Sequence, residues 1–374
     1  MKFLFWLGLV AIVTPQLRAS DLEKLATSTD FKQSSSLAKK LQADPDTDLL
    51  TVLEAMKGKS DVNKNWLLSV AQTVADRDPK SSMASLDQFL PRLSEDSAAR
   101  YWAFTYVTRG DNAKREKLLD SMLADPSLEL RYAAVALALK NLEANETLSD
   151  KARVAAYQEY LAAARLPTQI QSIAEKLEEL GQEVDLRRHF GFVSNWQTVG
   201  PFNNVDKVGF GEIYQPESDY LSNKMNTKAD YDGKTDKVAW QSVSTEAEDG
   251  AVDLAVTFNK EKGAVAYVLG EFLVPDELQC QVRLGSKNAS KVWINGELVI
   301  SREVYHSGGQ IDQYVAPVKL KKGTNSILLK SCQNEQEQSW AQDWAFQLRF
   351  TDDTGYAIQP LRRRQLSTPD SNSK

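Results

Sequence analysis

"KVWINGELV", residues 291–299, predicts a β-hairpin. Asn295 and Gly296 readily adopt the positive φ angles that a two-residue type I′ turn requires, and apolar residues flank them on both sides. In that register apolar residues face one another across the hairpin, in the pairs Trp293–Leu298 and Val292–Val299. An apolar cross-strand partner favours a packed tryptophan over an exposed aromatic platform for a ligand. The motif therefore indicates a fold more than a site.

The C-terminal half, from about residue 190 to residue 355, continues this pattern of period two. Several segments alternate Val, Ile, Tyr or Trp with polar residues, between breaks of Gly, Asn and Asp. Three of them place apolar residues on one strand face: "VDLAVTF" (Leu254, Val256, Phe258), "ELQCQVRLG" (Leu278, Cys280, Val282, Leu284) and "WAFQLRF" (Trp344, Phe346, Leu348, Phe350). Because no helical pattern of comparable strength interrupts them, we expect an antiparallel β-sandwich.

The N-terminal half, residues 20–186, has apolar residues three and four apart and little Gly, which predicts amphipathic helices. Within residues 124–144, Asp125 is expected to cap a helix, with Pro126 in the first turn. Short helices cannot bury their apolar faces alone, so we expect them to stack in antiparallel pairs. The core of this stack should include the aromatic residues Tyr101, Trp102, Phe104 and Tyr106.

"DPSLELRYAAVALAL", residues 125–139, resembles the second half of a HEAT-type repeat, in which an Asp-Pro turn precedes a helix with Arg and small residues. The resemblance implies a HEAT-like helical-repeat domain, and such domains often bind a protein partner. An irregular helical bundle is the competing arrangement. No stripe of aromatic residues or of one charge sign identifies a partner from the sequence.

The first residues have the layout of a secretory signal peptide: Lys2, an apolar run over residues 3–13, and small residues at Ala19 and Ser20. We therefore expect a signal peptide over residues 1–19 and a secreted or periplasmic protein. The run is shorter than the about 20 residues of a transmembrane helix, so no membrane span is expected.

In an exported chain Cys280 and Cys332 could form a disulfide, but both lie in strand-like segments that suit buried thiols equally well.

The chain is acidic, with a formal net charge of −6 that becomes −8 when Lys2 and Arg18 leave with the signal peptide. This charge gives no electrostatic support to nucleic-acid binding or to binding of anionic membranes. The basic cluster "LRRRQ", residues 361–365, lies in a polar segment over residues 358–374. We interpret that segment as a disordered tail with solvated charges.

Three elements of residues 284–352 carry a family resemblance: the Val-Trp-Ile-Asn-Gly hairpin, "VKLKKGTNSILLK" with Gly323 and Asn325, and the strand from Trp344. Together they resemble the galactose-binding-like jelly roll, which is the sugar-binding domain of many glycoside hydrolases. The resemblance implies a jelly roll over residues 190–357. "FGFVSNWQTVGPFNNVDKVGF" (190–210) and "YDGKTDKVAW" (231–240) further resemble secreted proteins of planctomycete-type bacteria, in which such elements open this module behind helical repeats.

A sugar site needs an aromatic plane for the pyranose ring and polar groups for its hydroxyls, on loops at one edge of the sheets. Two loops supply both, "VYHSGGQ" (304–310) and "NEQEQSWAQDW" (334–344). The candidate ligand-binding residues are Tyr305, His306, Gln310, Trp340, Gln342 and Asp343, with Asn334 and Glu335 beside them. The competing interpretation places Trp340 as a cap on the end of the apolar core.

Catalytic groups are scarce, so we expect no catalytic residues. His189 and His306 lack metal-ligand spacing, and no Gly-x-Ser-x-Gly, P-loop or dinucleotide motif is present. A carboxylate pair or a Tyr305–His306 pair of a lyase is the remaining enzymatic alternative. No cofactor is expected. A structural calcium ion is common in this jelly-roll class, but "GSKNAS" (285–290) has Asn where the class would place Asp.

These observations predict a non-catalytic secreted or periplasmic protein that binds carbohydrate or glycoconjugate through jelly-roll loops. The first alternative is an envelope scaffold that holds a protein partner through its helical domain, with a purely structural β-sandwich. The second alternative is a hydrolase or lyase that acts on a glycan.

Overall fold

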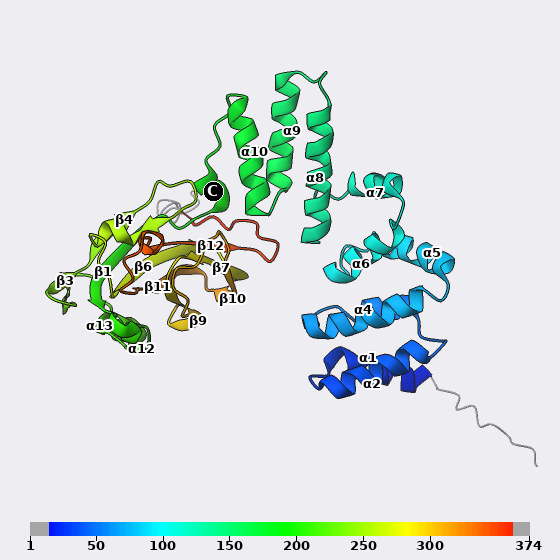
Figure 1. Ribbon diagram of the computed structural model, residues 1–374, viewed down its shortest axis with the longest axis horizontal. Coiled ribbons are helices and arrows are strands. Elements are labelled where there is room, and N and C mark those ends of the chain that lie inside the picture. The colour runs from blue at the N-terminus through cyan, green and yellow to red at the C-terminus, as the bar shows by residue number, and fades with distance from the viewer. Residues whose placement is uncertain (1–14, 362–374) are drawn as a thin grey trace, which may run out of the picture. The chain divides into compact units, whose positions relative to one another are not determined.

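The computed structural model describes residues 15–361, with side chains from residue 19 onward. A helical region precedes antiparallel sheets (Figure 1), which confirms the predicted order of the two kinds of structure. The chain divides into two compact units between Ala164 and Arg165. Residues 1–14 of the predicted signal peptide and residues 362–374 of the predicted tail lie outside the described residues.

Short helices make up the described part of the first unit. They are α1 (Pro15–Thr27), α2 (Phe31–Ala43), α3 (Leu49–Glu54), α4 (Asp61–Ala75), α5 (Pro79–Phe89), α6 (Ser97–Val107), α7 (Asn112–Leu119), α8 (Leu128–Ala144) and α9 (Asp150–Ala163). Most begin at an Asp or Ser whose side chain accepts a backbone N–H of the first turn, as at Asp30, Asp48, Ser60, Asp78, Asp96, Asp111, Ser127 and Ser149. These caps satisfy donors that a helix leaves unpaired, so the sequence itself sets the boundaries.

A buried ion pair links α6 to the turn before α8. The guanidinium of Arg100 donates to both carboxylate oxygens of Asp125 at 2.6 Å and to the carbonyl of Leu90 at 3.0 Å. Arg131 donates through Nε to the carbonyl of Asp125 at 2.7 Å. The predicted capping role of Asp125 is therefore wrong, because its carboxylate binds Arg100 and Ser127 caps α8.

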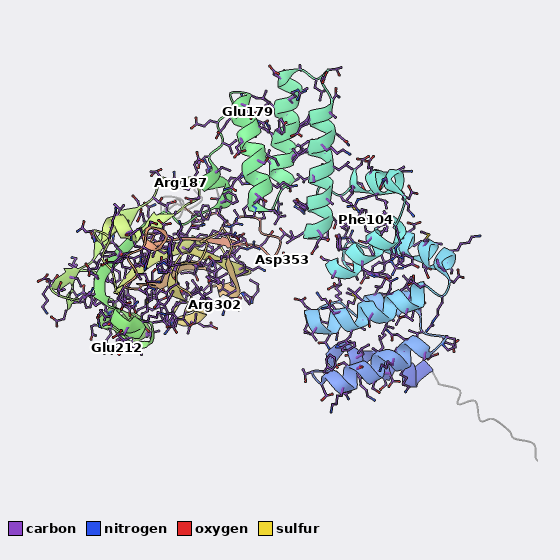
Figure 2. All side chains as sticks on the ribbon, viewed as in Figure 1. Phe104, Glu179, Arg187, Glu212, Arg302 and Asp353 are labelled. Carbon is purple, nitrogen blue, oxygen red and sulfur yellow. The ribbon has the colours of Figure 1, made fainter. Side chains whose placement is uncertain are left out.

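Apolar side chains of α1 to α8 form the core of this unit, and Phe104, labelled in Figure 2, is fully buried in it. Tyr106 is buried as predicted and Trp102 packs against the same core. The prediction for Tyr101 is wrong, since 41% of its surface is exposed on the outward side of α6.

The second unit begins with α10 (Pro167–Glu179) and α11 (Leu186–Phe190) and continues with strands. The six-stranded sheet has the order β4-β1-β6-β11-β8-β9, from strands β1 (Asn195–Asn203), β4 (Gln241–Ser244), β6 (Ala264–Val274), β8 (Ala289–Ile294), β9 (Glu297–Arg302) and β11 (Gly323–Gln333). The four-stranded sheet has the order β10-β7-β12-β5, from β5 (Val252–Asp253), β7 (Leu278–Ser286), β10 (Tyr314–Leu320) and β12 (Ala345–Thr351). A small hairpin joins β2 (Asp230–Asp232) to β3 (Lys237–Ala239), and short helices lie between strands at α12 (Val208–Gly211), α13 (Gln215–Leu221) and α14 (Leu254–Thr257).

One apolar core contains side chains from both sheets, so the sheets pack face to face. The predicted inward residues of β7 and β12 lie in or against this core, from Leu278 to Leu284 and from Trp344 to Phe350.

The prediction of a strand over residues 252–258 is wrong beyond Asp253. The Asp253 carboxylate accepts the N–H of Val256 and caps the short helix α14, which leaves Val256 70% exposed.

The predicted hairpin is confirmed between β8 and β9. Asn295 and Gly296 form the turn with φ angles of 53° and 89°, and Trp293 is buried opposite Leu298. The second predicted pair is wrong, because the register shifts beside Trp293 and Val292 pairs with Ile300. Such a bulge inserts one residue into one strand, which displaces every later pair by one.

A second apolar cluster lies on the other face of the six-stranded sheet, under the segment between β1 and β4. A buried lysine, Lys330, fixes this segment. Its ammonium donates to Glu217 Oε2 at 3.1 Å and to the carbonyl of Phe210 at 3.4 Å, while the Tyr267 hydroxyl donates to the same carboxylate oxygen at 2.7 Å. Lys330 on β11 is therefore the polar anchor between the sheet and helices α12 and α13.

The two cysteines are free thiols in different places. Cys280 belongs to the core between the sheets, whereas Cys332 belongs to the outer cluster. The structure therefore shows two buried free thiols and no disulfide between Cys280 and Cys332.

Strand β10 is an edge of the four-stranded sheet and pairs with β7. Pro317 lies in its middle and is exposed, with Lys319 two residues later on the same face. Proline has no N–H and is tolerated within sheets mainly at edges, which agrees with this place.

Candidate functional site

Three loops meet at one end of the six-stranded sheet: residues 204–207 after β1, residues 303–313 after β9, and residues 334–344 after β11. Buried amides hold them together. Asn204 donates through Nδ2 to the Tyr305 hydroxyl at 3.3 Å and to the Gln333 carbonyl at 2.9 Å. Asn288 donates to Gln333 Oε1 at 2.7 Å, and Gln333 Nε2 in turn donates to the Ala341 carbonyl at 3.3 Å. The loops thus rest on a fixed polar base.

The backbone of these loops is strained at four residues that are not glycine. Asp206, Lys207, His306 and Asp312 have φ angles of 55°, 63°, 58° and 63°. Left-handed conformations are uncommon for such residues, cost of order 1–3 kcal/mol, and cluster where the surrounding structure and the function require them. The strain directs these side chains and adds a physical reason to treat this end of the sheet as functional.

Trp340 is the most exposed aromatic residue of the site, with 60% of its surface accessible, in the short turn Ser339–Ala341. His306 contacts it edge to face, with ring centroids 5.1 Å apart and an interplanar angle of 89°. His306 Nε2 lies 2.8 Å from Asn334 Oδ1, which also accepts the N–H of Gln336 at 3.2 Å. Because this amide oxygen can only accept, Nε2 carries a proton, and the imidazole is fixed against the indole.

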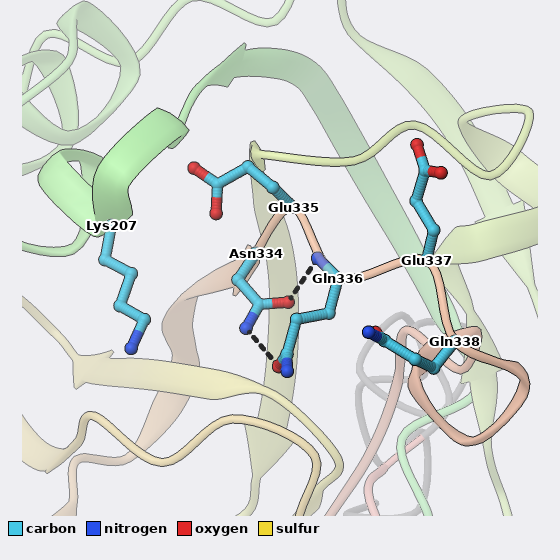
Figure 3. A pocket seen from close by; sticks show the side chains of 6 residues that line it. All are labelled: Lys207, Asn334, Glu335, Gln336, Glu337 and Gln338. Carbon is cyan, nitrogen blue, oxygen red and sulfur yellow. Dashed lines mark hydrogen bonds between the residues drawn. The ribbon is translucent and has the colours of Figure 1, made fainter.

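An open pocket of about 610 Å³ is lined by Lys207 and residues 334–338 (Figure 3), and His306 contacts one of these lining residues, Asn334. Asn334 is buried and donates through Nδ2 to Gln336 Oε1 at 2.9 Å. The Glu335 carboxylate accepts the N–H of Asp206, which ties the pocket's two loops together. The lining has amides, carboxylates and one ammonium, the groups that bind hydroxyls.

Tyr305 is half-buried under Lys207, whose ammonium lies 5.3 Å from the centre of its ring. Burial raises the pKa of Tyr305 to about 12, and the hydrogen bond from Asn204 opposes this shift. The phenol is therefore neutral at physiological pH, whereas a catalytic base needs a pKa near that pH. Its hydroxyl contacts Asn204 and the His306 ring contacts Trp340, so the two residues face different neighbours.

None of the six predicted site residues is among those that line the pocket. His306 contacts both Trp340 and the lining residue Asn334, and Tyr305 lies under the lining residue Lys207. Gln342 stabilises the loop over residues 334–344, since its Nε2 donates to the carbonyls of Glu337 and Gln338 at 2.6 and 3.0 Å. Asp343 forms an ion pair with Lys287 at 2.5 Å and does not line the pocket. Gln310 is exposed and also outside the lining.

The lining residues Lys207, Gln336, Glu337 and Gln338, and Asn204 beneath them, were not among the predicted site residues. Lys207 and Asn204 come from a loop about a hundred positions before Tyr305. Hydrophobic periodicity does not indicate which loops meet at a sheet edge. The polar run "NNVD" directly after the β1 strand is a turn signal that could have drawn attention to this loop.

No protein-family model and no curated protein matches the chain. Among solved structures, an anti-sigma factor domain-containing protein from Clostridium clariflavum is 14% identical over 27% of this chain and 31% of its own, with a TM-score of 0.21. A β-glucosidase from Kluyveromyces marxianus in complex with glucose is 13% identical over 27% of this chain and 12% of its own, with a TM-score of 0.20. The chain thus spans less than a third of either structure, and likenesses this weak support no inference about function.

Across residues 15–361, none of the helices combines the length and apolar character that crossing a bilayer requires. In the same residues no three His, Cys, Asp or Glu side chains gather in a way that could hold a metal ion. The Asn of "GSKNAS", Asn288, donates its amide N–H to Gln333 Oε1 at 2.7 Å.

Proposed function

We propose that this chain is a non-catalytic, secreted or periplasmic protein that binds carbohydrate or glycoconjugate at the pocket beside Trp340. The observation that carries the proposal is an exposed indole held edge-on by His306, whose ring also contacts Asn334 in the lining of a pocket with amides and carboxylates. A pyranose ring has an apolar face that packs on an aromatic plane and hydroxyls that need donors and acceptors. A fixed ring binds with a lower entropy cost than a mobile one.

We further assign the second unit to the galactose-binding-like jelly roll and the first unit to the HEAT-like repeats. Support for the first assignment comes from two antiparallel sheets with a shared core and from the matching hairpin. Support for the second comes from the succession of capped helical pairs and from the Arg100–Asp125 pair that links α6 to the turn before α8. The resemblance to planctomycete-type secreted proteins rests on the sequence motifs alone.

Replacing Trp340 by Ala is expected to weaken binding to the recognised glycan more than about tenfold, which corresponds to 1.4 kcal/mol. Folding should not change, because the indole is largely exposed and buries little surface. Retention on immobilised polysaccharides, followed by calorimetry with the oligosaccharide that binds, measures the effect.

Tyr356→Ala is the matched control, since Tyr356 is an aromatic residue of the same unit with 57% of its surface exposed and outside the pocket. This variant should bind like the unsubstituted protein. Absence of binding to every neutral and acidic glycan tested would contradict the proposal, as would full binding by Trp340→Ala.

A second candidate function, a scaffold for a protein partner, is favoured by an apolar surface on the first unit. Phe31 on α2 and Val62 on α4 are 73% and 65% exposed, and Phe31 contacts Trp66 edge to face at 5.3 Å. Val62 and Trp66 are four residues apart and so share one side of the helix.

Substituting Ser for both Phe31 and Val62 in the full chain should abolish co-purification of a partner from envelope extracts of the source cells. Leu93→Ser, at an exposed position in the loop after α5, is the control and should retain that partner. If the unsubstituted chain and the double variant recover the same proteins, this surface holds no partner.

A further inference from the structure

The ammonium of Lys207 is the one charged donor among the residues that line the pocket. Within the described residues this ammonium lies over the ring of Tyr305, and no carboxylate pairs with it there. Lys207 also adopts the left-handed conformation, which an L-residue adopts at a cost. A lysine held at such a position directs its ammonium into the pocket, where a ligand can supply the missing negative charge.

The charged side chains of the lining point in different directions. In the view of Figure 3, the ammonium of Lys207 and the amides of Asn334 and Gln336 lie on one side, and the carboxylates of Glu335 and Glu337 extend to the other. Amide N–H groups and an ammonium are all donors. One side of the pocket is therefore suited to an anionic group.

Neither carboxylate of the lining forms an ion pair with Lys207 within the described residues. Glu335 accepts the N–H of Asp206, which holds this carboxylate against the backbone of the neighbouring loop. The ammonium of Lys207 is therefore left without an anionic partner in the described part of the chain, and a ligand can supply one.

We propose that the ligand of this pocket is an acidic saccharide, and that Lys207 binds the carboxylate of its uronic acid. This inference rests on the proposed function and specifies its ligand class. Lys207 and the amide N–H of the exposed Gln336 bind the carboxylate, while Trp340 packs against a pyranose ring of the same oligosaccharide. Lys207 is thus the residue that determines specificity between acidic and neutral sugars.

The test compares ligands that differ in charge alone. Oligosaccharides of galacturonate, alginate and hyaluronan are each paired with their carboxyl-reduced counterpart, and neutral glucans, galactans and mannans complete the set. We expect at least one acidic oligosaccharide to bind, its reduced counterpart to bind more than about tenfold more weakly, and the acidic affinity to fall as salt screens the charge.

Substitutions of Lys207 test whether this residue recognises the carboxylate of the ligand. Lys207→Gln should lose the preference for the acidic member of the pair and retain the weaker affinity for the reduced one, whereas Lys207→Arg should keep the preference. Lys224→Gln, at an exposed lysine outside the pocket, is the matched control and should behave like the unsubstituted protein.

The outcomes separate the two proposals. Binding of neutral glycans alone, or equal binding of both members of each pair, overturns the inference about acidic saccharides and leaves carbohydrate binding in place. An acidic preference that survives in Lys207→Gln also overturns it. Binding of no glycan at all contradicts the proposed function itself.

Discussion

Replacing Asp125 by Ala is expected to lower the free energy of unfolding of the helical unit by about 3–5 kcal/mol, the usual cost of removing one partner of a buried ion pair. The guanidinium of Arg100 is 1% exposed and donates to both oxygens of this carboxylate. Without Asp125 it would stay buried with only the carbonyl of Leu90. Urea unfolding of the full chain, followed by hydrogen exchange of peptides from each unit, assigns the loss to the first unit.

Asp87→Ala is the control for this prediction. Asp87 pairs with Lys114 at 2.8 Å in the same unit, but both side chains are accessible to solvent. Exposed pairs contribute about 0–1 kcal/mol, so its unfolding curve should almost superimpose on that of the unsubstituted protein. Equal effects of the two substitutions would show that Arg100 does not depend on its buried partner.

The second large effect is expected at Lys330, where replacement by Ala should cost the second unit about 3–5 kcal/mol. The substitution leaves the Glu217 carboxylate buried, with the hydroxyl of Tyr267 as its remaining donor among those the structure records. Burial lowers the pKa of Lys330, and the charge of Glu217 opposes that shift. Each buried charge is thus stabilised by the other, so removing the ammonium of Lys330 leaves the carboxylate of Glu217 without its counter-charge.

Hydrogen exchange provides the readout for Lys330→Ala, because peptides of α12 and α13 should exchange faster than those of the core between the sheets. Lys322→Ala is the control, since Lys322 pairs with Asp276 on the surface. A double variant, Lys330→Met with Glu217→Gln, removes both charges and should recover part of the stability. Slow exchange of α12 and α13 in Lys330→Ala would contradict the anchoring role.

The main features of the fold could be predicted because local signals carried them. Asn295 and Gly296 specify a turn whatever surrounds them, and the alternation in β7 and β12 reflects burial on one face. The wrong predictions also come from local signals, which do not show what a side chain meets in the folded chain. Asp253 caps a short helix where alternation predicted a strand, and Asp125 binds a distant arginine where its position predicted a cap.

The candidate site could be predicted only in part. Tyr305, His306 and Trp340 were predicted because aromatic residues in polar loops are visible in the sequence, and their part in binding stays a prediction. Lys207 was not, because its relation to Tyr305 depends on two strand ends that meet in space. Asp343 has the right chemistry, but its carboxylate pairs with Lys287. Loop composition identifies the groups that could act, and tertiary structure decides which of them meet.

Pro317 has a consequence for self-association. An edge strand offers unpaired backbone groups to any other extended chain, which is the usual start of sheet-to-sheet aggregation. In β10 the missing N–H of Pro317 and the charge of Lys319 interrupt that row, and at the opposite edge β5 is only two residues long. The two outer strands of the four-stranded sheet, β10 and β5, therefore offer a second chain no long, uninterrupted row of backbone donors and acceptors.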